Sequence, residues 1–404
     1  MNSLRNLIKV LARGLNSLAG RAASMLRRPR KPGSPLADRL LADALRLAEM
    51  PSPAGKEERR IDFVLDRLNS LGVTSRVDGE GNILARLHPA EAGGEPPLLL
   101  FADLGSRRWH PLESLSRLDQ EYARGAGLAD SLGAAALLSV AEGFSSNTIK
   151  SRRDILLLFA VRSGDDPENK LFLPYVEDPA KRPKAALGIR GLLLGTLTTR
   201  ARGTCRMEIS LSRDRQAPRG AAVSPTAVVD TLLSVAGRLS GISWDTEGLT
   251  RLYIRRIEAA TTFGRCPAEA EMDVELESSD GALLEMATNT VRATVENSGS
   301  PGIRIVIGTS SGIPVGDPVV NGELVNTVTE VMKEQRIKIT EDQGADISAF
   351  LSNRGIPALY LGIALGEEGP EQDTIEINSI ERGRQVLEKV ILRLAQGEDS
   401  RGGT

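Results

Sequence analysis

The chain has 404 residues, 41% of them hydrophobic and 26% charged, which is long enough for at least two domains with their own cores and excludes both a disulfide-held miniprotein and a disordered chain. Two cysteines and two histidines are too few for a disulfide framework, a cysteine-rich zinc site or a histidine-rich metal centre, and such sparse cysteine fits a reducing compartment. Residues 1–37 hold eight basic residues and no acidic one, so the remainder, with 43 basic and 53 acidic residues, is an acidic body that disfavours nucleic acid as a partner.

Residues 1–37 predict a basic amphipathic helix followed by a linker. Leucine and isoleucine recur at intervals of three and four between Leu4 and Leu18, which places them on one stripe of a helix. No apolar run reaches the roughly 20 residues that a membrane span requires. Three interpretations stay open for residues 1–30: a peripheral membrane contact of a cytoplasmic protein, a mitochondrial transit peptide cleaved on import, or a basic tail.

From residue 38 the pattern changes to that of an α/β domain. Two of its strands are continuous apolar runs, Pro97–Ala102 and Ile155–Val161, with an alanine- and leucine-rich helix between them. Continuous apolar strands that alternate with helices indicate a mixed, mostly parallel sheet covered by helices on both faces. We expect helices at 36–50, 57–71 and 131–142 and a hairpin formed by 73–77 and 83–87.

Residues 200–309 predict a second, inserted domain. Its elements follow a βαββαβ order, which is the signature of a ferredoxin-like α+β domain. We expect strands at 206–212, 252–259, 269–277 and 303–307 and helices at 226–239 and 280–296. The α/β domain resumes over 310–397 with helices at 323–334 and 380–394 around a strand at 358–363, and residues 398–404 form a disordered tail.

The order of segments over residues 38–397 resembles the zinc-dependent aminopeptidase, aminoacylase and desuccinylase superfamily, which includes peptidase T and carboxypeptidase G. The segments that carry the resemblance are Met50–Glu58, Asp78–Ala85, Leu98–Ser106, Gly125–Leu138, Leu156–Asp166, Cys266–Asp280, Gly344–Ala364 and Ile375–Ile391. The resemblance implies a discontinuous α/β domain, 38–199 with 310–397, that would carry two zinc ions. It also implies that 200–309 is a lid and dimerisation domain, so we expect a homodimer through a lid helix and an edge strand such as Arg206–Ser212.

The resemblance places the family's metal ligands on residues that mostly cannot bind zinc. Where the family has a histidine, one residue and an aspartate, this chain has Asp103–Gly105. Asp130 matches the bridging aspartate, but the pair of glutamates, general base then ligand, falls on Ser163 and Gly164. Zinc catalysis needs nitrogen and oxygen ligands and a group that takes a proton from water. The sequence therefore retains one ligand of this part of the site and loses the base.

The remaining positions also depart from the family. The further acidic ligand falls on Arg190, the last histidine ligand on Gly369, and the substrate arginine on Glu277. Removing metal ions while leaving carboxylates would strand buried negative charge, so we expect a compensating cation and predict that Arg190 pairs with Asp130. His88 and His110 are interpreted as loop residues without a catalytic role.

The sequence thus favours a catalytically inactive relative that binds a ligand or partner in the former cleft and needs no cofactor. The candidate cleft residues are Asp103, Asp130, Asp165, Asp166, Arg190 and Asp346. The alternative is an active metal-dependent hydrolase of peptides or N-acyl amino acids, in which Asp103, Asp130 and Asp166, with Asp165 nearby, hold a divalent cation that prefers oxygen ligands. A purely structural or membrane-scaffolding role is the third possibility.

Overall fold

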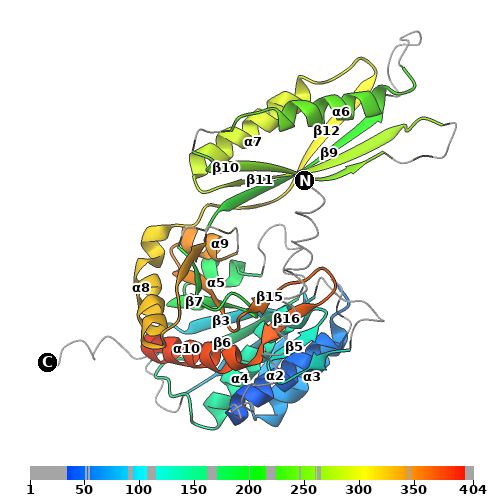
Figure 1. The fold of residues 1–404 in the computed structure, drawn as a ribbon. Coiled ribbons are helices and arrows are strands. Elements are labelled where there is room, and N and C mark those ends of the chain that lie inside the picture. Colours follow the sequence, from blue (N-terminus) through cyan, green and yellow to red (C-terminus); the bar gives the residue numbers. More distant parts are fainter. Residues whose placement is uncertain are drawn as a thin grey trace, which may run out of the picture.

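The computed structural model describes most of the chain beyond the leader and divides it into two parts (Figure 1). The described residues are 34–50, 52, 55–89, 94–106, 115–161, 171–199, 201–214, 224–244, 247–259, 261, 265–342, 344 and 347–395, with the side chains of 310 and 311 excepted. The predictions made for residues 1–33 and for the tail at 398–404 lie outside these ranges. Among the described helices, none combines the length and the apolar character needed to cross a membrane.

The larger part, the body, is built on a six-stranded sheet. Its strands are β1 (Ser75–Val77), β2 (Ile83–Leu87), β6 (Ile155–Ala160), β3 (Leu98–Asp103), β7 (Ala185–Arg190) and β14 (Ala358–Gly362), in that order across the sheet. The β1–β2 hairpin pairs antiparallel with β6, whereas β6, β3, β7 and β14 run parallel to one another. The mixed, mostly parallel sheet predicted from the continuous apolar runs is therefore confirmed.

Helices cover both faces of this sheet, and alternate residues of each strand meet different helices. Leu98 and Leu100 of β3 belong to the main core, and Leu99 and Phe101 point into a second, smaller core on the other face. The helices that contribute to the main core are α2 (Pro35–Ala48), α3 (Glu58–Ser70), α4 (Leu128–Ser145), α8 (Pro318–Glu334) and α10 (Ile377–Ala395). The short helices α5 (Leu173–Glu177) and α9 (Ser348–Asn353) cover the other face. Burial on both faces explains why these strands are apolar without alternation.

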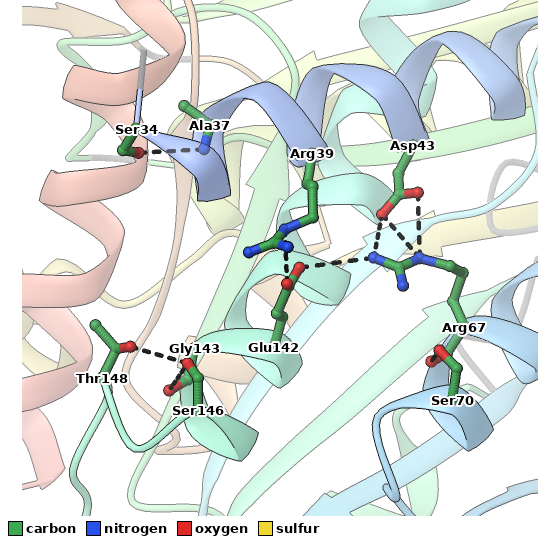
Figure 2. Close-up of polar contacts among 10 residues, drawn as sticks. All are labelled: Ser34, Ala37, Arg39, Asp43, Arg67, Ser70, Glu142, Gly143, Ser146 and Thr148. Carbon is green, nitrogen blue, oxygen red and sulfur yellow. Dashed lines mark hydrogen bonds and ion pairs between the residues drawn. The ribbon is translucent and has the colours of Figure 1, made fainter. Parts of the chain in front are cut away.

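Charged side chains bind α2 to its neighbours, as Figure 2 shows. Asp43 of α2 is buried and accepts hydrogen bonds from Nε and Nη2 of Arg67 on α3, at 3.1 and 2.9 Å. Arg67 also lies 3.6 Å from Glu142 of α4, and Glu142 in turn pairs with Arg39 of α2 at 2.7 Å. Ser34 caps the start of α2 and donates to Glu381 of α10. The first described helix is thus fixed to three other helices of the body.

The smaller part, the lid, has the predicted βαββαβ order. Its elements are β9 (Gly203–Arg213), α6 (Ala227–Ser240), β10 (Thr250–Glu258), β11 (Glu269–Ser278), α7 (Gly281–Glu296) and β12 (Ile303–Ile313). The strands form an antiparallel sheet in the order β10-β11-β9-β12, and apolar residues of α6 and α7 share a core with one face of it. This is the ferredoxin-like arrangement that the element order predicted.

The lid corrects one prediction. Residues Arg206–Ser212, expected to form an exposed edge strand, lie inside β9, which is hydrogen-bonded to β11 on one side and to β12 on the other. The sheet edges are β10 and β12. The cause is topological, since a βαββαβ domain places its first strand in the interior of the sheet. The homodimer itself stays a prediction, and pairing through a lid edge would have to use β10 or β12.

Two small sheets complete the body. One has the order β15 (Gly366–Glu367), β16 (Asp373–Glu376), β5 (Tyr122–Gly125) and β4 (Arg117–Leu118), and the other pairs β13 (Thr340–Asp342) with β8 (Thr196–Thr198). The β16–β5 pair brings a segment near the end of the chain against the residues that lead into α4. This contact positions the start of α4, where the candidate site lies.

Candidate functional site

The candidate site lies at the carboxyl edge of the body sheet, which we define as the ends of the parallel strands β3, β6, β7 and β14. In open α/β sheets, ligands bind in the crevice outside the carboxyl ends of the strands. Asp103 is the last residue of β3 and is exposed, and Arg190 is the last residue of β7. Asp130 lies in the first turn of α4, the helix that packs against β3 and β7. The chain therefore brings three of the six candidate residues to one region.

The start of α4 is held by side chains rather than left open. Gly127 precedes the helix with φ of 67°, the left-handed conformation that glycine adopts without strain. Buried Asp373 of β16 accepts the backbone N–H of Ala129 at 3.0 Å. Asp130 accepts a hydrogen bond from the Ser106 hydroxyl, also at 3.0 Å. Carboxylates at this end of a helix are stabilised by the positive end of its dipole.

A buried arginine that the sequence analysis did not identify lies beside these carboxylates. Arg60 of α3 is 1% exposed, and its Nη1 donates to the carbonyl oxygen of Leu104 at 2.8 Å. Burial lowers the pKa of Arg60 to about 10, although the nearby charges of Asp130 and Glu57 act in the opposite direction. The sequence signal was its spacing, because Arg60, Val64 and Leu68 form the buried stripe of α3 at intervals of four.

Arg190 has a different environment from the one predicted. Its guanidinium carbon lies 4.0 Å from the centroid of the Tyr360 ring, a cation–π geometry. The Tyr360 ring packs edge-on against Phe101, with centroids 5.3 Å apart. The contact that the structure gives for the Arg190 guanidinium is with Tyr360 and not the predicted one with Asp130. Side-chain alternation along β7 places Arg190 with Tyr360 and Phe101 on the face opposite α4.

Several residues named in the sequence analysis lie outside the described residues, namely Asp165, Asp166, Asp346, His110, Ser163 and Gly164. His88 lies well away from the carboxyl edge, directly after β2, where its Nδ1 is 2.6 Å from Asp154 and its side chain is 64% exposed.

Comparison with solved structures identifies the architecture, whereas no family model and no curated protein matches this sequence. A tripeptidase from Staphylococcus aureus superposes with a TM-score of 0.67 and 16% identity, covering 89% of this chain and 99% of its own. Human carnosine dipeptidase 1 gives 0.67 and 11%, covering 89% and 97%. The Bacillus subtilis YxeP protein, described as a dinuclear metal-binding peptidase of the M20 family, gives 0.63 and 14%, covering 89% and 98%.

The chain has the fold of the M20 peptidases. The match includes the lid as well as the body, since nearly the whole length of each of these peptidases is covered. The architecture that the sequence resemblance implied is therefore confirmed. A shared fold does not determine the chemistry, which depends on the residues at the site.

The described residues of the M20-like site do not fit a dinuclear zinc centre. Asp103 supplies one carboxylate, but the two residues after it are Leu104, whose carbonyl already accepts from Arg60, and a glycine. The carboxylate that matches the bridging ligand, Asp130, already accepts a hydrogen bond from Ser106 in the same loop. In the part of the chain that is described, no three His, Cys, Asp or Glu side chains gather as ligands. These residues therefore support no hydrolytic step through a metal ion.

Proposed function

We propose that this protein is a non-catalytic member of the M20 peptidase fold that binds a peptide-like ligand or a partner protein at the carboxyl edge of the body. The observation that carries the proposal is the buried guanidinium of Arg60, which donates to the carbonyl of Leu104 in the same loop whose Ser106 donates to Asp130, the one retained ligand position. A guanidinium neutralises a carboxylate, but it offers no open coordination position and cannot lower the pKa of a bound water as zinc does.

The opposite face of the carboxyl edge supports binding. Half-buried Arg190 and Tyr360 combine a cation with an aromatic ring that Phe101 supports from the core, and exposed Asp103 ends the strand that carries Phe101. Such a set of apolar surface with a few fixed charges suits a peptide, which has an apolar side chain and charged ends. Loss of the catalytic groups need not remove these contacts, because binding and water activation use different residues.

The test of the proposal uses the purified full-length chain. We expect no stoichiometric zinc and no cleavage of dipeptides, tripeptides or N-acyl amino acids, measured by elemental analysis and by chromatography of the products. A panel of the same peptides should raise the thermal midpoint of the protein without being consumed. About one or two tightly bound transition metals per chain, with hydrolysis that Asp130→Ala abolishes, would instead establish the oxygen-ligand hydrolase.

Residues 1–30 extend the proposal to a membrane surface. Seven positive charges and a leucine stripe add electrostatic and hydrophobic attraction to an anionic membrane. We expect the full chain to co-sediment with vesicles that contain anionic lipid and a chain lacking residues 1–33 to remain in the supernatant. Equal sedimentation of the two proteins at moderate salt would reject the anchor.

The lid extends the proposal to a homodimer. The strands β10 and β12 are the edges of the described sheet, and an edge strand can pair with that of a second copy. We expect light scattering at micromolar concentration to give twice the mass of the chain. A monomeric mass would reject this part of the proposal alone.

A further inference from the structure

An exposed leucine with a strained backbone lies in the loop between β7 and β8. Leu193 has φ of 70°, in the left-handed region, and is 50% exposed, whereas its neighbours Leu192 and Leu194 are both 5% exposed. The left-handed conformation crowds the Cβ of a leucine, and contact of an apolar side chain with water adds a second cost. A glycine or an asparagine would reduce both costs at this position, so the presence of a leucine calls for an explanation.

The other described residues with a positive φ have ordinary explanations. Apart from Leu193 they are glycines, with the exceptions of Asn147 and Arg336. Each of these two follows the residue that caps the C-terminus of a helix, α4 in one case and α8 in the other, which is the usual place for a left-handed residue. Leu193 lies between two strands instead, and the same loop has a glycine, Gly195, at its next position with a positive φ.

The surrounding structure fixes this conformation of Leu193. The N–H of Leu194 donates to the carbonyl of Ala364 at 3.1 Å, and the carbonyl of Leu193 accepts from the N–H of Thr196 at 2.9 Å. Gly362 of β14 packs against the same carbonyl, since a Cβ at Gly362 would lie 2.5 Å from the oxygen of Leu193. A strained residue persists only where its surroundings over-determine it, and such residues cluster at ligand sites.

The loop places Leu193 at the carboxyl edge of the body sheet. Leu193 follows Arg190, the last residue of β7, by three residues. The loop runs alongside the segment that leaves β14, where the N–H of Ile363 donates to the carbonyl of Arg190 at 3.0 Å. Leu365 on that segment is also exposed, at 38%. Exposed leucines therefore lie on both segments that continue from the strand ends carrying Arg190 and Tyr360.

We propose that Leu193 contacts an apolar side chain of the peptide-like ligand and gives the site a preference for peptides that carry one. The inference rests on the proposed function and deepens it, because it names the class of side chain that the ligand presents. Contact with an apolar side chain removes Leu193 from water, which a small or polar side chain would do less well. The fixed backbone keeps the leucine in solvent, where a ligand can reach it.

The experiment measures the binding of trileucine and of trialanine to the purified full-length chain by isothermal titration calorimetry, together with thermal midpoints. Leu193→Asn removes the apolar side chain and also relieves the strain, because asparagine tolerates a positive φ. Leu193→Ala removes most of the side chain and retains the strain. The matched control is Leu233→Ala, which shortens a leucine of α6 in the lid that is 58% exposed.

We expect the wild type to prefer trileucine to trialanine. Both variants at position 193 should weaken the binding of trileucine by on the order of tenfold and change that of trialanine by less than about twofold. Leu193→Asn should also raise the thermal midpoint by about 1–3 °C, whereas Leu193→Ala should not. Leu233→Ala should leave both affinities unchanged. A variant that binds its ligand less tightly and is more stable than the wild type would show that leucine is kept for binding.

Three outcomes reject the inference and leave the proposed function in place. Leu193→Asn could retain the wild-type affinity for trileucine, or it could weaken both peptides equally. It could also lower the thermal midpoint, which would show that the fold rather than the ligand requires this leucine. If the wild type binds neither peptide, the proposed function itself is rejected, and the inference is rejected with it.

Discussion

The body and the lid bury their sheets in two different ways. Strand β3 of the body is buried along almost its whole length and reads LLLFA before its final aspartate, because both of its faces meet helices. Strand β11 of the lid reads EAEMDVELES, in which Ala270, Met272, Val274 and Leu276 face α6 and α7 and the residues between them are acidic. The body therefore tolerates little added volume and no unpaired charge, whereas the open face of the lid sheet holds charge at low cost.

The largest loss of stability should come from replacing a glycine at a helix–sheet contact in the body. A Cβ at Gly383 of α10 would lie 1.8 Å from the carbonyl oxygen of Ile363, so Gly383→Ala should destabilise the protein by about 3 kcal/mol or more. The matched control is Gly237→Ala in α6 of the lid, where no atom lies within 4 Å of the added Cβ. That change should stabilise the lid helix by about 0.5–1 kcal/mol. Urea denaturation measures both, and equal effects would contradict the comparison.

A smaller loss should follow from breaking the buried ion pairs of the body. Arg67→Met leaves the Asp43 carboxylate, 7% exposed, without the guanidinium that donates to it, at a cost of about 2 kcal/mol. Adding Asp43→Ala should recover part of that loss. The control is Arg46→Met on the exposed side of α2, which should change the free energy of unfolding by less than about 0.5 kcal/mol. A loss from Arg67→Met no larger than that of the control would show that these pairs do not fix α2.

The carboxylate of Glu275 in the lid should contribute less to the free energy of unfolding than the Asp43 pair does, and its contribution should depend on pH. Burial opposes ionisation of Glu275, but hydrogen bonds from Arg255 and Arg206 outweigh it and keep the pKa of this carboxyl below its usual value. A lowered pKa gives stability that is complete above the unfolded value of about 4.3 and is lost as the pH falls through the folded value. Glu275→Gln should cost about 1 kcal/mol at pH 7 and flatten the acid limb of the stability profile. An unchanged acid limb would exclude this assignment.

The smallest change in stability is expected from replacing Arg256, the arginine of the lid with several ion-pair partners. Arg256 lies within 3.0 Å of Glu258, Glu271 and Asp273, yet these pairs stand in solvent. Exposed ion pairs are screened by water and salt, so Arg256→Met should leave the unfolding midpoint unchanged within error. A loss comparable to that of Glu275→Gln would show that the open face of the lid is less accessible to solvent than its exposed side chains indicate.

The architecture was predictable because it depends on patterns that extend over many residues. The apolar runs of β3 and β6 indicated a sheet buried on both faces, and alternation in β11 indicated a sheet buried on one. The position of β9 was not predictable in the same way. Its alternating residues are compatible with an edge or an interior strand, and only the pairing with β11 and β12 decides between them.

The site was less predictable because it depends on single side chains. The spacing of the motifs located Asp103 and Asp130, but it suggested Arg190 as the compensating cation because Arg190 stands where a ligand was expected. Strand alternation places Arg190 with Tyr360, and the cation near Asp130 comes from α3 instead. A charged residue within an apolar helical stripe was the available signal for Arg60. The residue that accepts its hydrogen bond, Leu104, is 44 residues away in the sequence and meets it only in the folded chain.

The connection between lid and body has a mechanical consequence. The two chain segments that enter and leave the lid are paired with each other, with Thr204 opposite Ile313, and the pairing continues toward the body where the N–H of Gly316 donates to the carbonyl of Ala201 at 3.0 Å. Figure 1 shows this two-stranded root between the parts. The two connections are therefore joined to each other rather than independent linkers, so any displacement of the lid has to move both of them together.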